Sequence, residues 1–143
     1  MRFWDSSAIV PLAAEESVSR GCRALLRANP RQVVWYFTRS EAVSALFRRH
    51  RQGALDDQEL RAAERRLERL SGRWTEVDGV GAVRELAERL LRFHPLTAAD
   101  TLQLAAALVA VDGRPRGQVF VSLDEALLAA AQREGFDPVR PTE

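Results

Sequence analysis

Short apolar segments alternate along the chain with longer segments whose apolar residues recur every three or four positions. The short segments are rich in residues that favour strands, whereas the longer spacing is that of one face of a helix. We expect strands at 2–4, 33–37, 74–77 and 119–121, with a possible edge strand at 136–139. We expect helices over 8–14, 17–28, from Thr38 onward, and over 56–70, 80–93, 97–111 and 124–133.

Strands separated by helices predict parallel strands joined by helical crossovers. The expected fold class is therefore α/β, a three-layer α/β/α arrangement with a small, mainly parallel sheet between helices. The segment Thr97–Val111 is apolar on nearly every side, which predicts a helix buried on most sides. No linker, repeat or low-complexity segment interrupts residues 1–143, so we expect a single domain.

Four carboxylates fall where such a sheet gathers its functional residues, at the carboxyl ends of strands and the starts of the following helices. They are Asp5, Glu41, Asp100 and Asp124. Carboxylates brought together repel one another, so they either bind protons with raised pKa values or share a divalent cation. Ligands that are all oxygen favour Mg²⁺, with Mn²⁺ as a substitute, and such a site can activate water against a phosphodiester.

Each of these carboxylates also has a simpler structural explanation. Glu41 and Asp100 each stand three residues after a threonine, which is the spacing of a capping box. Asp124 fits a helix N-cap, and Asp5 fits an aspartate in a turn. Asp100 differs from the others because it continues the apolar line of its helix and should face inward, where an unpartnered carboxylate is costly.

Serines near these carboxylates in the sequence are candidates to orient them by hydrogen bonds. Ser6 and Ser7 follow Asp5 directly, and Ser122 stands two residues before Asp124. Helix capping is the simpler role for each of the three.

Four segments carry a resemblance to a known family: Phe3–Ala8, Ser40–Ala42, Leu96–Ala105 and Phe120–Asp124. They resemble the PIN domain, specifically its VapC-like toxins, and the likeness extends over nearly the whole chain. The resemblance implies a Mg²⁺-dependent endoribonuclease that acts on RNA as the toxin of a type II toxin–antitoxin pair. It further implies a homodimer that an antitoxin protein holds inactive.

The resemblance also implies roles for single residues. Asp5 and Asp100 would be the firmest metal ligands, and Glu41 and Asp124 would complete the acidic site. The chain departs from the family pattern at three positions: Thr101 and Gln103 stand where many relatives carry Ala and His, and Ala126 stands where some carry a further acid. The missing acid leaves open whether one or two metal ions bind.

Composition narrows the classes of function. The formal net charge of +1 argues against a protein that coats DNA, and any contact with nucleic acid must be local. The single cysteine, the absence of a signal-peptide pattern and the lack of an apolar run of about 20 residues predict a soluble, cytoplasmic protein without a membrane span. The two histidines, His50 and His94, lack metal-ligand spacing and are expected to be structural.

Two alternatives to the nuclease remain open. The first is a non-catalytic PIN-like module that binds a protein or RNA through helices rich in Arg and Leu. The seam of Leu60, Leu67 and Leu70, with Leu46 and Phe47 before it, is a candidate groove for an antitoxin helix, and packing within the protein explains much of the same pattern. The second is a phosphatase of the haloacid-dehalogenase kind with Asp5 as nucleophile. It is disfavoured because position 7 is Ser rather than the second Asp of that motif.

Overall fold

The computed structural model describes residues 1–143, and its five short strands form one parallel sheet. The strands are β1 (Arg2–Trp4), β2 (Gln32–Trp35), β3 (Thr75–Val77), β4 (Val119–Val121) and β5 (Asp137–Val139), and their order in the sheet is β3-β2-β1-β4-β5. The chain builds outward from central β1 to β2 and β3, and then crosses to β4 and β5 on the other side. The order therefore changes direction between β1 and β4, which is where ligand sites of such sheets lie.

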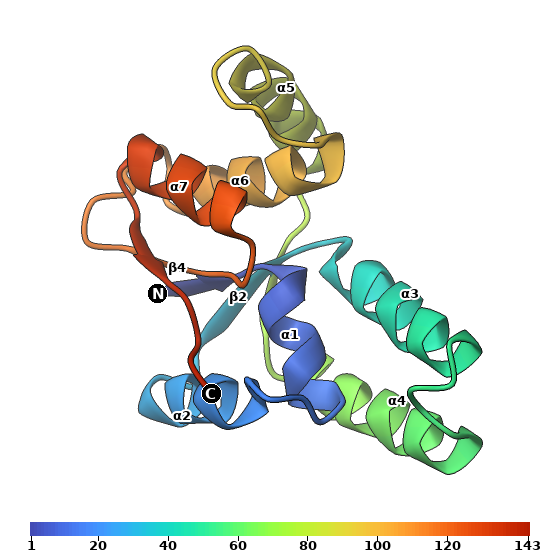
Figure 1. The fold of residues 1–143 in the computed structure, drawn as a ribbon. Coiled ribbons are helices and arrows are strands. Elements are labelled where there is room, and N and C mark those ends of the chain that lie inside the picture. The colour runs from blue at the N-terminus through green and yellow to red at the C-terminus, as the bar shows by residue number, and fades with distance from the viewer.

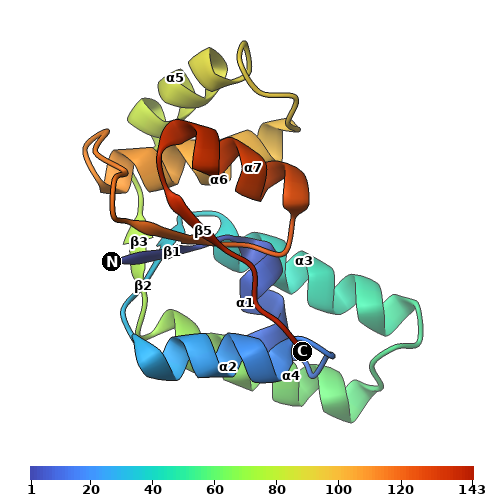
Figure 2. The same ribbon diagram turned by 60° about the vertical axis from the view of Figure 1, so that its left-hand side comes forward.

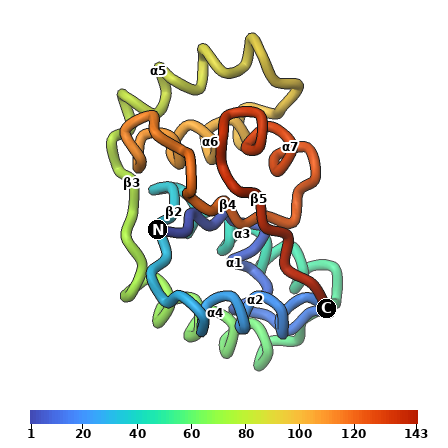
Figure 3. Tube along the Cα trace, turned by 90° about the vertical axis from the view of Figure 1, so that its left-hand side faces the viewer, coloured from blue at the N-terminus to red at the C-terminus, as the bar shows by residue number.

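Seven helices cover the two faces of the sheet, so the expected three-layer α/β/α fold is confirmed (Figure 1). One layer holds α1 (Ser6–Ala13), α2 (Ser19–Ala28), α3 (Thr38–Arg51) and α4 (Asp57–Ser71). The other holds α5 (Val80–Leu90), α6 (Ala98–Ala110) and α7 (Glu125–Glu134). Figure 2 and Figure 3 show the strands between these two groups, with α5 outermost.

The sheet has a separate apolar core on each face because side chains alternate along a strand. Phe3, Trp35 and Phe120 pack toward α5, α6 and α7, and the rings of Phe3 and Phe120 stack with centroids 5.4 Å apart. Their strand neighbours face the opposite core with α1 to α4, and they are Trp4, Val34 and Val121. Burial on both faces holds the short strands firmly, so the residues that follow them have defined positions.

Several element boundaries differ from the expectation, and two of them fall at exposed aromatic residues. The second strand ends at Trp35, and the next two residues leave the sheet with exposed rings, Tyr36 at 46% and Phe37 at 45%. The helix expected over 80–93 ends at Leu90, and Phe93 is 74% exposed in the following turn. In both places the sequence contains apolar residues that the fold does not bury, so periodicity alone extended the element too far.

The apolar seam on α4 serves internal packing rather than an open groove. Leu60 and Leu67 are buried in the core beneath the sheet, and Leu70 packs against the same core. Trp74 is also buried there. The three leucines therefore take part in packing within the protein, which is the second explanation of this seam. No helix is both long and apolar enough to cross a membrane.

Candidate metal centre and active site

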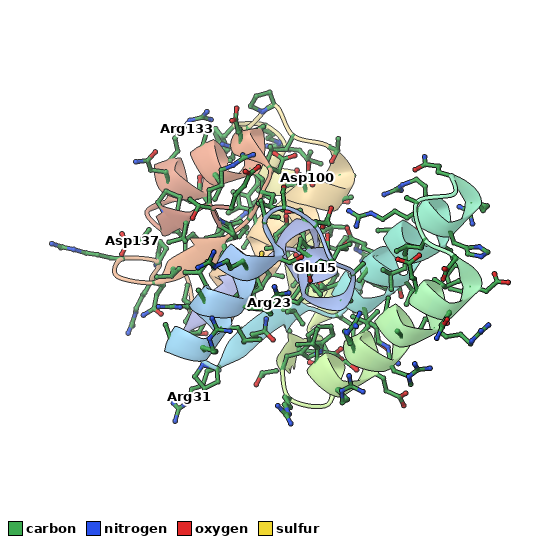
Figure 4. The ribbon with its side chains drawn as sticks, turned by 60° about the horizontal axis from the view of Figure 1, so that its bottom comes forward. Glu15, Arg23, Arg31, Asp100, Arg133 and Asp137 are labelled. Carbon is green, nitrogen blue, oxygen red and sulfur yellow. The ribbon has the colours of Figure 1, made fainter.

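All four predicted carboxylates line one open cleft at the carboxyl ends of the central strands. Asp5 follows β1, Asp124 follows β4, Glu41 lies near the start of α3 after β2, and Asp100 lies in the first turn of α6. The cleft has a volume of about 560 Å³. In the view of Figure 4, Asp100 lies in the upper middle of the picture, whereas Arg31 and Asp137 lie toward its edge. The fold thus brings together residues that are up to 119 positions apart, as the topology predicts.

Asp5 lies deepest in the cleft, with only 3% of its surface exposed. Its Oδ2 accepts hydrogen bonds from Ser7 Oγ at 2.5 Å and Ser122 Oγ at 2.8 Å, while its Oδ1 receives only a long contact from Ser6 Oγ at 3.4 Å. Burial raises the pKa of the Asp5 carboxyl, and the two serine hydroxyls offset part of that rise. One oxygen is therefore fixed by the protein and the other is left for the cleft.

The two serines that hold Asp5 also join the strand ends to each other. Ser7 Oγ accepts a hydrogen bond from the backbone N–H of Leu123 at 2.9 Å, and Ser122 Oγ accepts one from the N–H of Asp124 at 3.0 Å. Both hydroxyls donate to Asp5, so of the two roles considered for them the structure shows orientation of the acid, and they tie the turn after β1 to the turn after β4.

Glu41 is held by side chains from two other elements. Ser6 Oγ donates to its Oε2 at 3.2 Å, and Gln103 Nε2 donates to its Oε1 at 3.0 Å. The capping box expected with Thr38 is absent, because α3 begins after Phe37 and the Thr38 hydroxyl instead accepts from Gln103 Nε2 at 3.2 Å. Burial raises the pKa of Glu41, and the nearby Asp5 and Asp100 raise it further.

Asp100 and Asp124 combine a helix-capping environment with a place in the cleft. The N–H of Asp100 donates to Thr97 Oγ1 at 3.2 Å, so Thr97 caps α6, and the expected capping box is present in this half only. Asp124 caps α7 because its Oδ1 accepts from the N–H of Leu127 at 2.8 Å. Burial raises the pKa of Asp100, with further contributions from Asp124 and Asp5. Its carboxyl is half-buried at the cleft wall, so the expected inward orientation is met only in part.

The chemistry of the donor set fits a divalent cation that prefers oxygen. The cleft is lined by four carboxylates but only one guanidinium, that of Arg48. As they stand, no three acidic, histidine or cysteine side chains are close enough to form a ligand group. Burial raises the pKa of Asp5, Glu41 and Asp100, and the neighbouring carboxylates raise those of Glu41 and Asp100 further. A cation in the cleft would relieve both costs.

The two histidines lie outside the cleft and are paired within the structure, as expected. His94 is buried, and its Nε2 lies 2.7 Å from Glu134 Oε2. His50 Nε2 lies 2.6 Å from Asp57 Oδ1 near the ends of α3 and α4.

Sequence reasoning missed the role of Gln103, which interrupts the apolar run of α6. This fully buried amide joins α6 to α3 through Thr38 and Glu41. The available signal was a polar residue on an otherwise apolar helix, because buried polar groups are nearly always hydrogen-bonded.

We expect Gln103→Leu to destabilise the protein by about 1–3 kcal/mol, since it leaves the buried hydroxyl of Thr38 and one oxygen of Glu41 unpartnered. Urea unfolding measures this change. Gln103→His retains an N–H donor and should lose less stability. If the Leu variant were as stable as the unmodified protein, the hydrogen bonds of Gln103 would contribute nothing to the fold.

Comparisons with known proteins find similar folds but no match to the sequence. The chain matches no protein-family model and no curated protein. It is similar in structure to PAE2754 from Pyrobaculum aerophilum, with a TM-score of 0.62 and 23% identity over 95% of this chain and 82% of the other. It is similar to FitAcB from Neisseria gonorrhoeae, with a TM-score of 0.67 and 17% identity over 96% and 97% of the two chains.

A third structure of the same kind is FitAB bound to an IR36 DNA fragment, with a TM-score of 0.59 and 17% identity over 99% of this chain and 95% of the other. At these identities the likeness concerns the fold. The class that fold and topology define is a three-layer α/β/α domain of the PIN-like type.

Proposed function

We propose that this chain is a Mg²⁺-dependent endoribonuclease and the toxin of a toxin–antitoxin pair. The observation that supports the proposal best is the convergence of four carboxylates from four separate segments on one cleft, three of them with raised pKa values. Perturbed carboxylates that gather in a cleft are typical of catalytic and metal sites.

In this proposal Asp5 and Asp100 are the principal metal ligands, and Glu41 and Asp124 complete the set. Bound there, Mg²⁺ would lower the pKa of a water and neutralise charge that develops on the phosphate under attack. Ser7 and Ser122 keep Asp5 in one orientation, and Ser6 and Gln103 do the same for Glu41. Ligands fixed before the metal binds need no reordering, which favours both affinity and rate.

The proposed partners rest on the family resemblance and on one fold neighbour. That neighbour is FitAB bound to an IR36 DNA fragment, a chain of this fold in a DNA-bound assembly. On the family resemblance, we propose that this protein acts in the cytoplasm as a homodimer and is held inactive by an antitoxin protein. RNA rather than DNA is proposed as the substrate because the VapC-like motifs imply it.

Removal of the metal tests the function directly. We expect the purified protein to cleave RNA in Mg²⁺, to lose cleavage in EDTA and to regain it with Mg²⁺ or Mn²⁺. Calorimetric titration with Mn²⁺ should give heat that Asp100→Asn abolishes. Glu85→Gln, an exposed acid on α5 outside the cleft, is the matched control and should bind as the unmodified protein does. Absence of both binding and cleavage would favour the non-catalytic binding module instead.

A further inference from the structure

An exposed aromatic side chain stands on the wall of the acidic cleft. Phe37 lines the same cleft as the four carboxylates and is 45% exposed. Single exposed apolar residues are common on protein surfaces, so exposure alone carries no meaning. The position of this ring beside the proposed reaction centre is what calls for a functional explanation.

The ring of Phe37 is held in place by its two aromatic neighbours in sequence. Its centroid lies 5.6 Å from that of buried Trp35 at an interplanar angle of 68°, and 5.1 Å from that of Tyr36 at 77°. Both contacts are edge-on, so neither neighbour is stacked flat against Phe37. The result is an aromatic surface that is anchored to the core through Trp35 yet open to the cleft.

The same wall of the cleft continues along α3 with polar side chains at helical spacing. Ser40, Ser44 and Arg48 line the cleft one turn after another, and the distance along the helix from Phe37 to Arg48 is about 16 Å. Arg48 forms no ion pair, whereas its neighbour Arg49 pairs with Glu16. The wall thus has the aromatic face of Phe37 at one end and, at the other, the guanidinium of Arg48, which forms no ion pair.

We propose that this wall binds single-stranded RNA, with an unpaired base stacked on Phe37 and a backbone phosphate at Arg48. The inference rests on the proposed function and adds to it the two residues that position the substrate, Phe37 and Arg48. Aromatic side chains beside a basic group are the usual means of holding single-stranded nucleic acid without reading its sequence.

The arrangement favours an unpaired strand over a duplex. A base inside a duplex is already stacked on both faces and cannot offer one to a protein ring. The four carboxylates of the cleft repel phosphates, so a strand needs a non-electrostatic attachment beside them, and stacking supplies it. A cation about 16 Å from the ring then holds the strand beyond the acidic floor.

Fluorescence anisotropy with a short labelled, unstructured RNA tests the proposal. Measurements use the Asp100→Asn protein with Mg²⁺, so that the strand is bound without being cut. We expect Phe37→Leu in this background to weaken binding about tenfold, the effect of losing one stacked base. Phe37→Tyr should bind like the parent because it keeps the aromatic face. Phe93→Leu is the matched control, since it removes a more exposed ring that does not line the cleft.

Arg48 gives an independent arm of the test. Arg48→Gln should reduce the slope of log affinity against log salt concentration by about one, the effect of losing one phosphate contact. Arg51→Gln, exposed on the same helix but outside the cleft, should leave the slope unchanged. Should Phe37→Leu fail to fold, as judged by circular dichroism, this arm decides the matter. The same sequence annealed into a duplex should bind weakly and without dependence on Phe37.

The proposal is overturned if Phe37→Leu binds as tightly as the parent, if Phe93→Leu loses as much affinity, or if duplex and single strand bind alike. Its failure can be told apart from failure of the proposed function. RNA cleavage by the unmodified protein with an unchanged kcat/KM in Phe37→Leu would reject only the stacking role. Binding that depends on Phe37 without any Mg²⁺-dependent cleavage would reject only the nuclease.

Discussion

Replacement of Asp5 by Asn is expected to lower the rate of RNA cleavage by at least about a hundredfold, since loss of residues that merely support metal ligands already costs about 10–100-fold. Asp5 is the most buried of the four acids and follows the central strand. It is also the residue on which Ser7 and Ser122 converge. Its charge is therefore placed at the centre of the site at considerable cost in desolvation, and a neutral amide cannot supply that charge to a cation.

The fold should survive this substitution. An Asn side chain keeps an oxygen that accepts from the two serines, and Asn is as good an N-cap as Asp for the following helix. Asp137→Asn, the same chemical change on an exposed residue of the outer strand β5, is the matched control and should cleave normally. The measurement is the initial rate of RNA cleavage in Mg²⁺, together with growth of cells that produce each variant. Equal rates for Asp5→Asn and the control would mean that the cleft is not the active site.

The sequence predicts the fold well because short apolar runs, typical of strands, alternate along it with apolar residues at helical spacing. Strands buried on both faces read as short apolar runs, and β1 and β4 end directly before a polar residue, Asp5 and Ser122 respectively. Once the strands are parallel, their carboxyl ends must share one edge, so the convergence of the acids follows from topology alone. The order of the strands, with β1 central, is not fixed by the pattern and needed the structure.

What the sequence could not give are the contacts between segments that only the fold brings together. The spacing Thr38-x-x-Glu41 fits a capping box, but both side chains instead accept hydrogen bonds from buried Gln103 on α6. Phe37 reads as the last residue of a strand, although the chain turns at Tyr36 and leaves its ring in the cleft. At Glu41 a local rule is displaced by a tertiary partner 62 positions along the chain, which no local window contains.

Asp100→Asn is expected to make the metal-free protein more stable at neutral pH, with a melting temperature higher by a few degrees. Burial and the nearby Asp124 and Asp5 raise the pKa of Asp100 in the folded state above its ordinary value of 3.8. The folded protein therefore holds this proton more tightly than the unfolded chain does, so its stability falls as the pH rises from about that value through the raised pKa. At neutral pH the cost is fully present, and Asn does not incur it.

The gain in stability should itself depend on pH and on metal. As the pH falls through the raised pKa, Asp100 takes up a proton in the folded protein and becomes neutral like Asn, so the difference between the two proteins should shrink. Saturating Mg²⁺ at neutral pH should stabilise the unmodified protein, because a ligand that binds only the folded state raises its stability, and should stabilise Asp100→Asn far less. Thermal unfolding across pH with and without Mg²⁺, with Glu85→Gln as the control, measures both effects. A stability difference that is constant from pH 4 to neutrality would show that the ionised Asp100 carboxylate does not destabilise the folded protein. The ionised Asp100 lowers the stability of the folded protein, and a single neutral substitution should remove that loss. A carboxylate of this kind serves binding rather than folding.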